Sequence, residues 1–316
     1  MIELQALTKT FGEQTAVKEV SLTVETGQFC TLIGTSGCGK STTLKMINRL
    51  IEPSAGKVLI NKQDVSTMPA ESLRRRIGYA IQGVGLFPHR NVFENIATVP
   101  LLLGWDKETI TLRVKELLKL FHLDYERFAT KFPHQLSGGE QQRVGVARAL
   151  AAKPEVLLMD EPFGALDPLT RESLQDEILS IQKILGITTI MVTHDIDEAI
   201  KMADVIAVMD KGTLLQFDTP QSLLRNPKPG FVSDIVGGLD RSLRLLTLNQ
   251  VKDVLNHNPT LVDGAPKTQI PFNTNLRDAV SMHIWEGEET LAVVDEAGSV
   301  VGTVSLNDIL SKGAKS

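Results

Sequence analysis

The sequence predicts an α/β fold built on a mainly parallel β-sheet, followed by a small α+β domain. Three observations lead to this prediction. Short runs such as 29–33 and 156–159 are apolar on both faces, as in strands that helices cover from both sides. Amphipathic stretches alternate with these runs over about the first 235 residues. The length of 316 residues is enough for roughly two domains.

The expected elements follow one another in a regular order. Buried strands are predicted at 29–33, 156–159, 188–192 and 205–208. Helices are predicted between them at 41–48, 107–121, 139–152, 168–185 and 196–202. A turn-rich stretch at 225–230 and the pair Gly237-Gly238 then indicate a joint. We therefore expect one domain over 1–236, with a helical subdomain at about 83–150, and a second domain over 239–316.

Composition excludes several classes of protein. The hydrophobic share of 42% and the net charge of −5 rule out a disordered chain and argue against a nucleic-acid-binding protein, which needs a basic face. Two cysteines are too few for a secreted scaffold held together by disulfides. Neither a signal peptide nor an apolar run of about 18 residues is visible, so we expect a soluble, reduced, intracellular chain.

A phosphate-binding loop is predicted at residues 34–41. Its residues fit the pattern G-x-x-x-x-G-K-[ST] between a strand and a helix; they are Gly34, Thr35, Ser36, Gly37, Cys38, Gly39, Lys40 and Ser41. The glycines let the backbone curl, so that N–H groups and the positive end of the helix dipole face the phosphates. Lys40 supplies positive charge to the β- and γ-phosphate oxygens, Ser41 offers a hard ligand to Mg²⁺, and Thr42 follows as a further nucleotide contact.

Two carboxylates complete the expected site. Asp160 and Glu161 follow the apolar run 156–159, and ligands of α/β sheets bind at the carboxyl ends of the strands. Asp160 is suited to hold Mg²⁺ through water, and Glu161 to polarise an attacking water as a general base. The sequence thus predicts a site that binds phosphates with Mg²⁺ and activates a water for their hydrolysis.

The stretch 136–143, Leu-Ser-Gly-Gly-Glu-Gln-Gln-Arg, identifies a family when it is combined with both phosphate motifs. The whole set resembles ABC-type ATPases over roughly residues 2–235, with Gln82, the triplet 165–167 and His194 in the family's order. The resemblance implies that two copies meet head to tail around two ATP molecules. The residues of one copy that then face the γ-phosphate held by Lys40 of the other are Ser137, Gly138 and Gly139.

The same resemblance implies roles for the remaining residues of the site. His194 and Gln82 would act in catalysis beside Glu161, and Gln82 would also join Ser41 and Asp160 as a metal ligand. Asp167 would contact nucleotide. Phe11 would stack on adenine, where tyrosine is commoner, and a core phenylalanine is the alternative. Ser137 and Glu140 also form a capping-box pattern, and the sequence leaves open whether the cap or a phosphate takes the Ser137 hydroxyl.

The segment after Gln82 resembles the importer class of this family. There, residues 82–95 would form a groove for a short permease helix, with apolar contacts from Leu86, Phe87 and Pro88; a plain core turn is the alternative. One ATPase unit without a membrane span would need separate integral-membrane permease subunits. It would then lie peripherally on the cytoplasmic face of the inner membrane.

The sequence at 81–89, 95–105 and 195–199 resembles that of ATP-binding subunits of glycine betaine, choline and carnitine importers. In such systems an extracytoplasmic binding protein delivers the solute. The alternatives are an importer for another solute, such as an amino acid, and a non-transport regulatory ATPase.

The last part of the chain resembles a CBS repeat at 290–310, preceded by a helix over 274–283. An echo of 303–310 at 245–255 suggests a degenerate first repeat. The alternatives are the strand-rich barrel tails and the ferredoxin-like tails of other importers. Residues 239–316 hold seven Lys or Arg and ten Asp or Glu, a net charge of −3 that does not support a broad basic patch for lipid. Regulation by ionic strength or nucleotide and a plain dimerisation or stability role both remain open.

Overall fold

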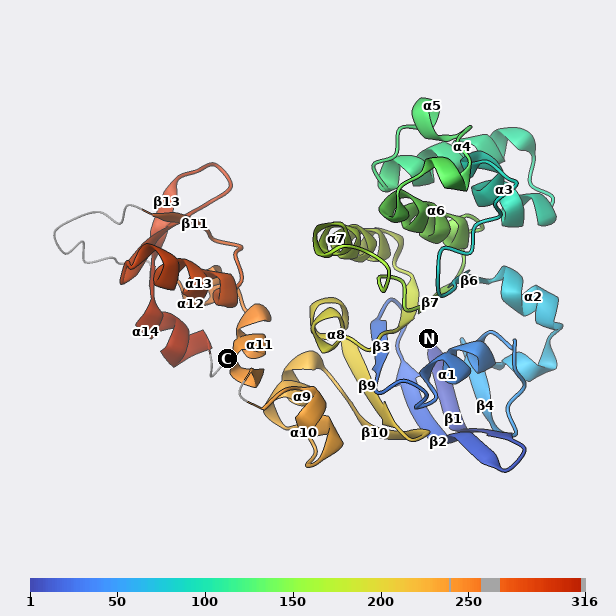
Figure 1. Ribbon diagram of the computed structural model, residues 1–316, viewed down its shortest axis with the longest axis horizontal. Coiled ribbons are helices and arrows are strands. Elements are labelled where there is room, and N and C mark those ends of the chain that lie inside the picture. The colour runs from blue at the N-terminus through green and yellow to red at the C-terminus, as the bar shows by residue number, and fades with distance from the viewer. Residues whose placement is uncertain (239, 257–267, 314–316) are drawn as a thin grey trace. The chain divides into compact units, whose positions relative to one another are not determined.

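The computed structural model describes residues 1–238, 240–256 and 268–313. The chain forms two compact units, residues 1–219 and 220–316 (Figure 1). The domain boundary expected at 236–239 falls inside the second unit. The reason is that α9 (Pro220–Arg225) packs against α11 (Arg241–Thr247), so the C-terminal unit begins before the turn-rich stretch.

A six-stranded sheet forms the centre of the first unit. Its order is β10-β9-β3-β8-β7-β6, and all neighbours are parallel except β9 and β10. The strands are β3 (Phe29–Ile33), β6 (Ile77–Ala80), β7 (Val156–Asp160), β8 (Thr188–Val192), β9 (Val205–Asp210) and β10 (Thr213–Asp218). Every residue of β3, β7 and β8 is buried, as expected for strands covered on both faces. The predicted α/β fold with a mainly parallel sheet is confirmed.

A second, antiparallel sheet of order β2-β1-β4-β5 was not predicted. Its strands are β1 (Ile2–Phe11), β2 (Gln14–Val24), β4 (Ala55–Ile60) and β5 (Gln63–Asp64). Ala6 and Glu19 have φ values of +44° and +49° and interrupt the alternation of β1 and β2. The Ala6 N–H donates to the Ser21 hydroxyl (2.8 Å) and the Glu19 N–H to the Thr8 hydroxyl (3.0 Å). These irregularities interrupt the alternation of apolar and polar residues by which the two strands could have been predicted.

The helices of the first unit include a group, α3 to α6, that packs apart from α1 and α2 (Figure 1). The helices are α1 (Lys40–Ile47), α2 (Ala70–Arg75), α3 (Val92–Leu102), α4 (Lys107–Leu120), α5 (Tyr125–Phe128), α6 (Gly138–Leu150), α7 (Pro168–Leu185) and α8 (Ile196–Met202), with 3₁₀ turns at Val65–Thr67 and Pro133–Gln135. The buried Arg113 of α4 donates to the carbonyls of Leu150 (2.8 Å) and Ala151 (3.2 Å). It thereby satisfies the carboxyl end of α6.

The second unit holds a three-stranded sheet of order β11-β12-β13 over its own buried core. Its elements beyond α9 are α10 (Phe231–Ile235), α11, α12 (Val251–Val254), β11 (Gln269–Pro271), α13 (Leu276–Glu286), β12 (Thr290–Val294), β13 (Val300–Ser305), α14 (Leu306–Asp308) and a π-helical turn (Ile309–Gly313). The helix expected over 274–283 is present as α13, and the stretch 290–310 contains the antiparallel pair β12 and β13. Helices α11 and α12 precede β11.

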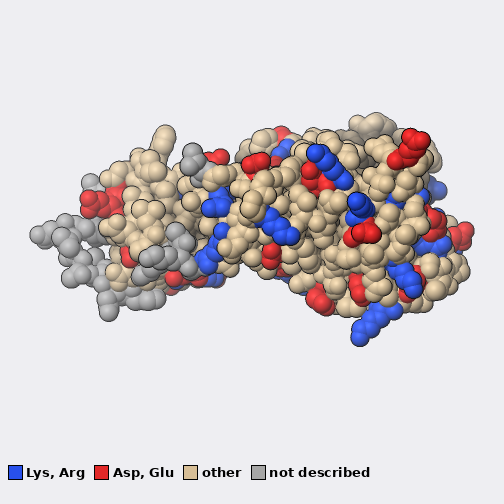
Figure 2. Space-filling model, turned by 90° about the horizontal axis from the view of Figure 1, so that it is seen from below, with Lys and Arg blue, Asp and Glu red and all other residues tan. Residues whose placement is uncertain are grey.

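Acidic and basic side chains are interspersed over the face of the first unit that Figure 2 draws. Within the described ranges, no helix is both long enough and apolar enough to cross a membrane.

Candidate functional site

The loop 34–41 joins β3 to α1 and requires glycine at two positions. Gly34 and Gly39 have φ values of +150° and +102°. A Cβ atom at Gly34 would collide with the carbonyl oxygen of Met209, and one at Gly39 with that of Ala16. The tight approach of neighbouring backbone therefore fixes the curled shape that was predicted to cradle phosphates.

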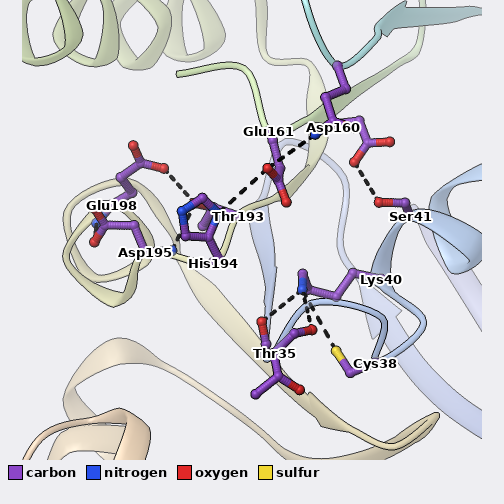
Figure 3. Close-up of polar contacts among 12 residues, drawn as sticks. Thr35, Cys38, Lys40, Ser41, Asp160, Glu161, Thr193, His194, Asp195 and Glu198 are labelled. Atoms are coloured by element: carbon purple, nitrogen blue, oxygen red, sulfur yellow. Dashed lines mark hydrogen bonds and ion pairs between the residues drawn. The ribbon is translucent and has the colours of Figure 1, made fainter. Parts of the chain in front are cut away.

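Lys40 places its ammonium group inside this loop (Figure 3). The buried side chain donates hydrogen bonds to the carbonyls of Gly34 (2.8 Å) and Thr35 (2.9 Å) and contacts the Cys38 sulfur at 3.8 Å. Burial raises the pKa of the Cys38 thiol more than the neighbouring Lys40 lowers it. The loop thus holds one fixed positive charge beside a neutral thiol.

Ser41 and Asp160 meet as the sequence predicted. The Ser41 hydroxyl donates to Asp160 Oδ1 at 2.8 Å, and Asp160 is buried at the end of β7. A hydroxyl and a carboxylate are oxygen ligands of the kind Mg²⁺ prefers. Among the residues that the structure describes, no group of three or more His, Cys, Asp or Glu side chains could hold a metal ion.

Glu161 has an unusual backbone conformation and two polar neighbours. Its φ is +46°, a left-handed value that is uncommon outside glycine and concentrates at functional sites. The Glu161 N–H donates to the Val192 carbonyl (2.9 Å), which anchors this conformation to β8. Gln82 Nε2 donates to Glu161 Oε2 at 3.4 Å, and His194 Nδ1 lies 3.6 Å from the same oxygen. The structure thus brings together the three residues predicted to act in catalysis.

A cavity of about 260 Å³ adjoins these residues. Gln82, Glu161 and His194 line it together with Gly138, from the start of α6, and Gln142. Gln142 is buried and was not among the predicted site residues. Its position one turn after Gly138 within the stretch 136–143 was the available signal.

A capping box between Ser137 and Glu140 forms at the start of α6. The Ser137 hydroxyl accepts a hydrogen bond from the Glu140 N–H (3.3 Å), and the Glu140 carboxylate accepts one from the Ser137 N–H (2.7 Å). In the single chain, the capping box therefore takes the Ser137 hydroxyl. The hydroxyl contact is long, so a phosphate has only a weak competitor there.

Phe11 and Asp167 lie at the ends of their elements. The Phe11 ring is 49% exposed, so the alternative of a core phenylalanine is wrong. Lys9 Nζ lies 5.0 Å from the centre of the ring. Asp167 caps α7 by accepting a hydrogen bond from the Thr170 N–H (3.1 Å), and the contacts with Thr170 lower the pKa of the Asp167 carboxyl.

The turn after Gln82 is organised by one buried side chain. The Asn95 amide donates to the carbonyls of Phe87 (3.2 Å) and Arg90 (2.9 Å), and its oxygen accepts the Phe87 N–H (2.8 Å). The Phe87 ring is 39% exposed, with the guanidinium carbons of Arg90 and Arg148 at 5.0 and 5.5 Å from its centre. The turn thus presents an aromatic ring flanked by two cations, whereas Leu86 packs against the core.

Comparison with known proteins shows which family the chain resembles. Residues 17–164 match the family described as ABC transporter. The glycine betaine uptake system ATP-binding protein YehX of Escherichia coli (strain K12) is 47% identical over 98% of this chain and 99% of its own length. The carnitine transport ATP-binding protein OpuCA of Listeria monocytogenes serotype 1/2a (strain 10403S) is 47% identical over 98% of this chain and 76% of its own length.

A solved structure supports the same assignment. The ATP-binding cassette MJ0796, as a dimer in a post-hydrolysis state bound to ADP and Pi, matches with a TM-score of 0.63 and 35% sequence identity. The match covers 70% of this chain and 99% of that one. The similarity therefore includes both the fold and the sequence of a nucleotide-binding cassette.

Proposed function

This chain belongs to the family of ABC transporter ATP-binding proteins, and we propose that it is the ATP-hydrolysing motor of an importer for glycine betaine, carnitine or a related osmoprotectant. The extent of the similarity carries this proposal. YehX and OpuCA match 98% of the chain, far beyond residues 17–164 and into the second unit. Two spermidine/putrescine import ATP-binding proteins PotA match less of the chain, 75% and 86%, at 44% and 40% identity.

The contacts of the site support a division of labour in hydrolysis. Lys40, held inside its loop, neutralises charge on the terminal phosphates. Ser41, Asp160 and the amide oxygen of Gln82 would hold Mg²⁺, which would supply positive charge against the charge of the phosphates. Glu161 takes the proton of the attacking water, and His194 beside it contacts the γ-phosphate.

Two copies act together in this proposal, as in the dimeric MJ0796 cassette. Residues 137–139 of one copy face the γ-phosphate bound to the other, where N–H groups at the start of α6 add to the positive end of its dipole. Asp167 and the exposed Phe11 ring complete the contacts with nucleotide.

The partners follow from the turn at 82–95. We assign the half-exposed Phe87, with Leu86 and Pro88, to the groove that receives a short helix of a membrane permease subunit. The protein would then lie on the cytoplasmic face of the inner membrane, and a binding protein would deliver the solute outside. For residues 239–316 we propose a CBS-like module, supported by the sheet β11-β12-β13 and helix α13, that regulates or dimerises the motor.

Uptake in cells tests the transport proposal directly. Cells that lack the gene would receive the wild-type chain, Glu161→Gln or the control Glu108→Gln, whose side chain is exposed in the first turn of α4. Labelled glycine betaine and carnitine would be supplied at low and high osmolarity. We expect uptake with the wild type and the control only. Equal uptake in all cells, including those without the gene, would point to another solute or to a non-transport ATPase.

A further inference from the structure

A polar network that the predicted site did not include lies next to His194 (Figure 3). The Thr193 hydroxyl donates to Glu198 Oε2 at 2.6 Å and accepts the Asp195 N–H at 3.1 Å. Thr193 and Asp195 are the two neighbours of His194 in the chain. Glu198, buried on α8, therefore fixes the backbone on both sides of the histidine through one hydroxyl.

Arg171 joins this network to a second loop of the site. It lies on the first turn of α7, four residues after Asp167. Arg171 Nη2 donates to the Leu166 carbonyl at 3.2 Å. On its other side, Nε lies 3.8 Å from Glu198 Oε1, and Nη1 lies 3.8 Å from Asp195 Oδ2. One guanidinium thus contacts the loop before α7 and both carboxylates that follow His194.

Arg171 makes no direct hydrogen bond to Asp195 or Glu198. Distances of 3.8 Å are too long for direct hydrogen bonds, and Arg171 Nε is buried without a hydrogen-bond partner in the described part of the chain. A cavity of about 50 Å³ lies at this point, lined by Arg171, Thr193, Glu198, His194 and Glu161 among others. It is polar and large enough for a bridging water. The link between Arg171 and Glu198 can therefore tighten or loosen without repacking of the core.

We propose that Arg171 and Glu198 are positioning residues for ATP hydrolysis, which tie the placement of His194 beside Glu161 to the position of the loop 165–167. Both residues would act through the backbone around His194, because Glu198 contacts Thr193 and Arg171 contacts Asp195. The loop 165–167 contains Asp167, a proposed nucleotide contact. Nucleotide-dependent movement of that loop would then be transmitted to His194 by a single side chain. The inference rests on the proposed ATPase function.

The chain offers a matched control on the same two helices. Lys201 of α8 pairs with Asp176 (2.8 Å) and Glu172 (4.0 Å) of α7. This ion pair also links α7 to α8, but its partners are exposed and do not belong to the network around His194. Lys201→Gln therefore removes a link between the helices and leaves the histidine support in place.

The test compares kcat, KM for ATP and equilibrium nucleotide affinity in the purified full-length protein. Arg171→Gln and Glu198→Gln should lower kcat by about 10- to 100-fold, which is the loss of rate expected when a catalytic group is misplaced. Nucleotide affinity and KM should stay within about two-fold of the wild type, and Lys201→Gln should keep kcat within about two-fold. The double variant should lose no more than about two-fold beyond the weaker single variant, because both changes break one link.

Several results would overturn the inference. These are an unchanged kcat in both single variants, an equal loss in Lys201→Gln, fully multiplicative losses in the double variant, or an effect mainly on KM. Thermal unfolding confirms that each variant is folded, and Arg171→Lys, which keeps the charge, replaces Arg171→Gln if that variant does not fold. A wild-type chain without ATPase activity would instead refute the proposed function, so the two failures are distinguishable.

Discussion

Replacing Glu161 by glutamine isolates the proposed general base from the rest of the site. Glutamine has nearly the same size and keeps one oxygen that can accept the 3.4 Å hydrogen bond from Gln82. The left-handed backbone at φ +46° depends on the bond of the Glu161 N–H to Val192, which the side-chain change leaves intact. The substitution therefore removes basicity and very little structure.

The expected loss follows from that single missing function. A positioned general base contributes about 10²- to 10⁴-fold in rate, which corresponds to about 2.7 to 5.5 kcal/mol in the activation barrier. ATP affinity should stay within about two-fold, because Lys40 and Ser41 do not contact Glu161 directly in the described contacts. Glu161→Gln should thus bind ATP, fail to hydrolyse it and accumulate as the nucleotide-bound dimer.

Three measurements on the purified protein test this expectation. Steady-state phosphate release gives kcat, titration with a fluorescent ATP analogue gives affinity, and light scattering with ATP gives the oligomeric state. Glu108→Gln, an exposed change of the same kind, controls for loss of charge. A kcat within ten-fold of the wild type would show that another group accepts the proton. A monomer in the presence of ATP would contradict the head-to-tail arrangement.

Two further predictions concern the phosphate loop and helix α6. Lys40→Met should weaken ATP binding by at least about ten-fold, the effect of losing one charged hydrogen bond; undiminished affinity in the same titration would show that the buried ammonium does not meet phosphate. Arg143→Met should lower the free energy of unfolding by about 2 kcal/mol, because Arg143 makes bonds of 2.8 and 2.7 Å to a Glu177 side chain that is only 11% exposed. Urea denaturation measures this change against Arg76→Met, which breaks the exposed pair with Glu155, and equal losses in the two variants would refute the reasoning.

Sequence reasoning found the parts of the site that are encoded locally. The loop 34–41 was predictable because its glycines and Lys40 are needed within one tight turn. Asp160 and Glu161 were assigned to the site because they end and follow an apolar strand, and parallel strands end at the same edge of a sheet. His194 was assigned by the family resemblance, and the structure places it after β8 beside Glu161.

The features that the sequence did not predict depend on the fold or on broken patterns. The antiparallel sheet escaped because bulges at Ala6 and Glu19 shift the alternation of its strands. The contact between Arg171 and Glu198 was not predicted, because a helix and a strand separate the two residues in the sequence and no local pattern indicates that they interact. The expected boundary at 236–239 differs from the division of the compact units at 219–220, because turn-forming residues within a unit look the same as those of a linker.

Contacts along its length make helix α6 a stiff element. Its 13 residues span about 20 Å. Gly145 brings the helix against the Val84 carbonyl, Arg148 donates to the Gly85 carbonyl at 2.7 Å, and Ser137 stands at the far end. Because Arg113 holds its last turn and Glu177 clamps its middle, α6 resists bending. Residues 84–85 and Ser137 are therefore joined by one stiff element, so a displacement of the turn after Gln82 would be carried along α6 to its first turn.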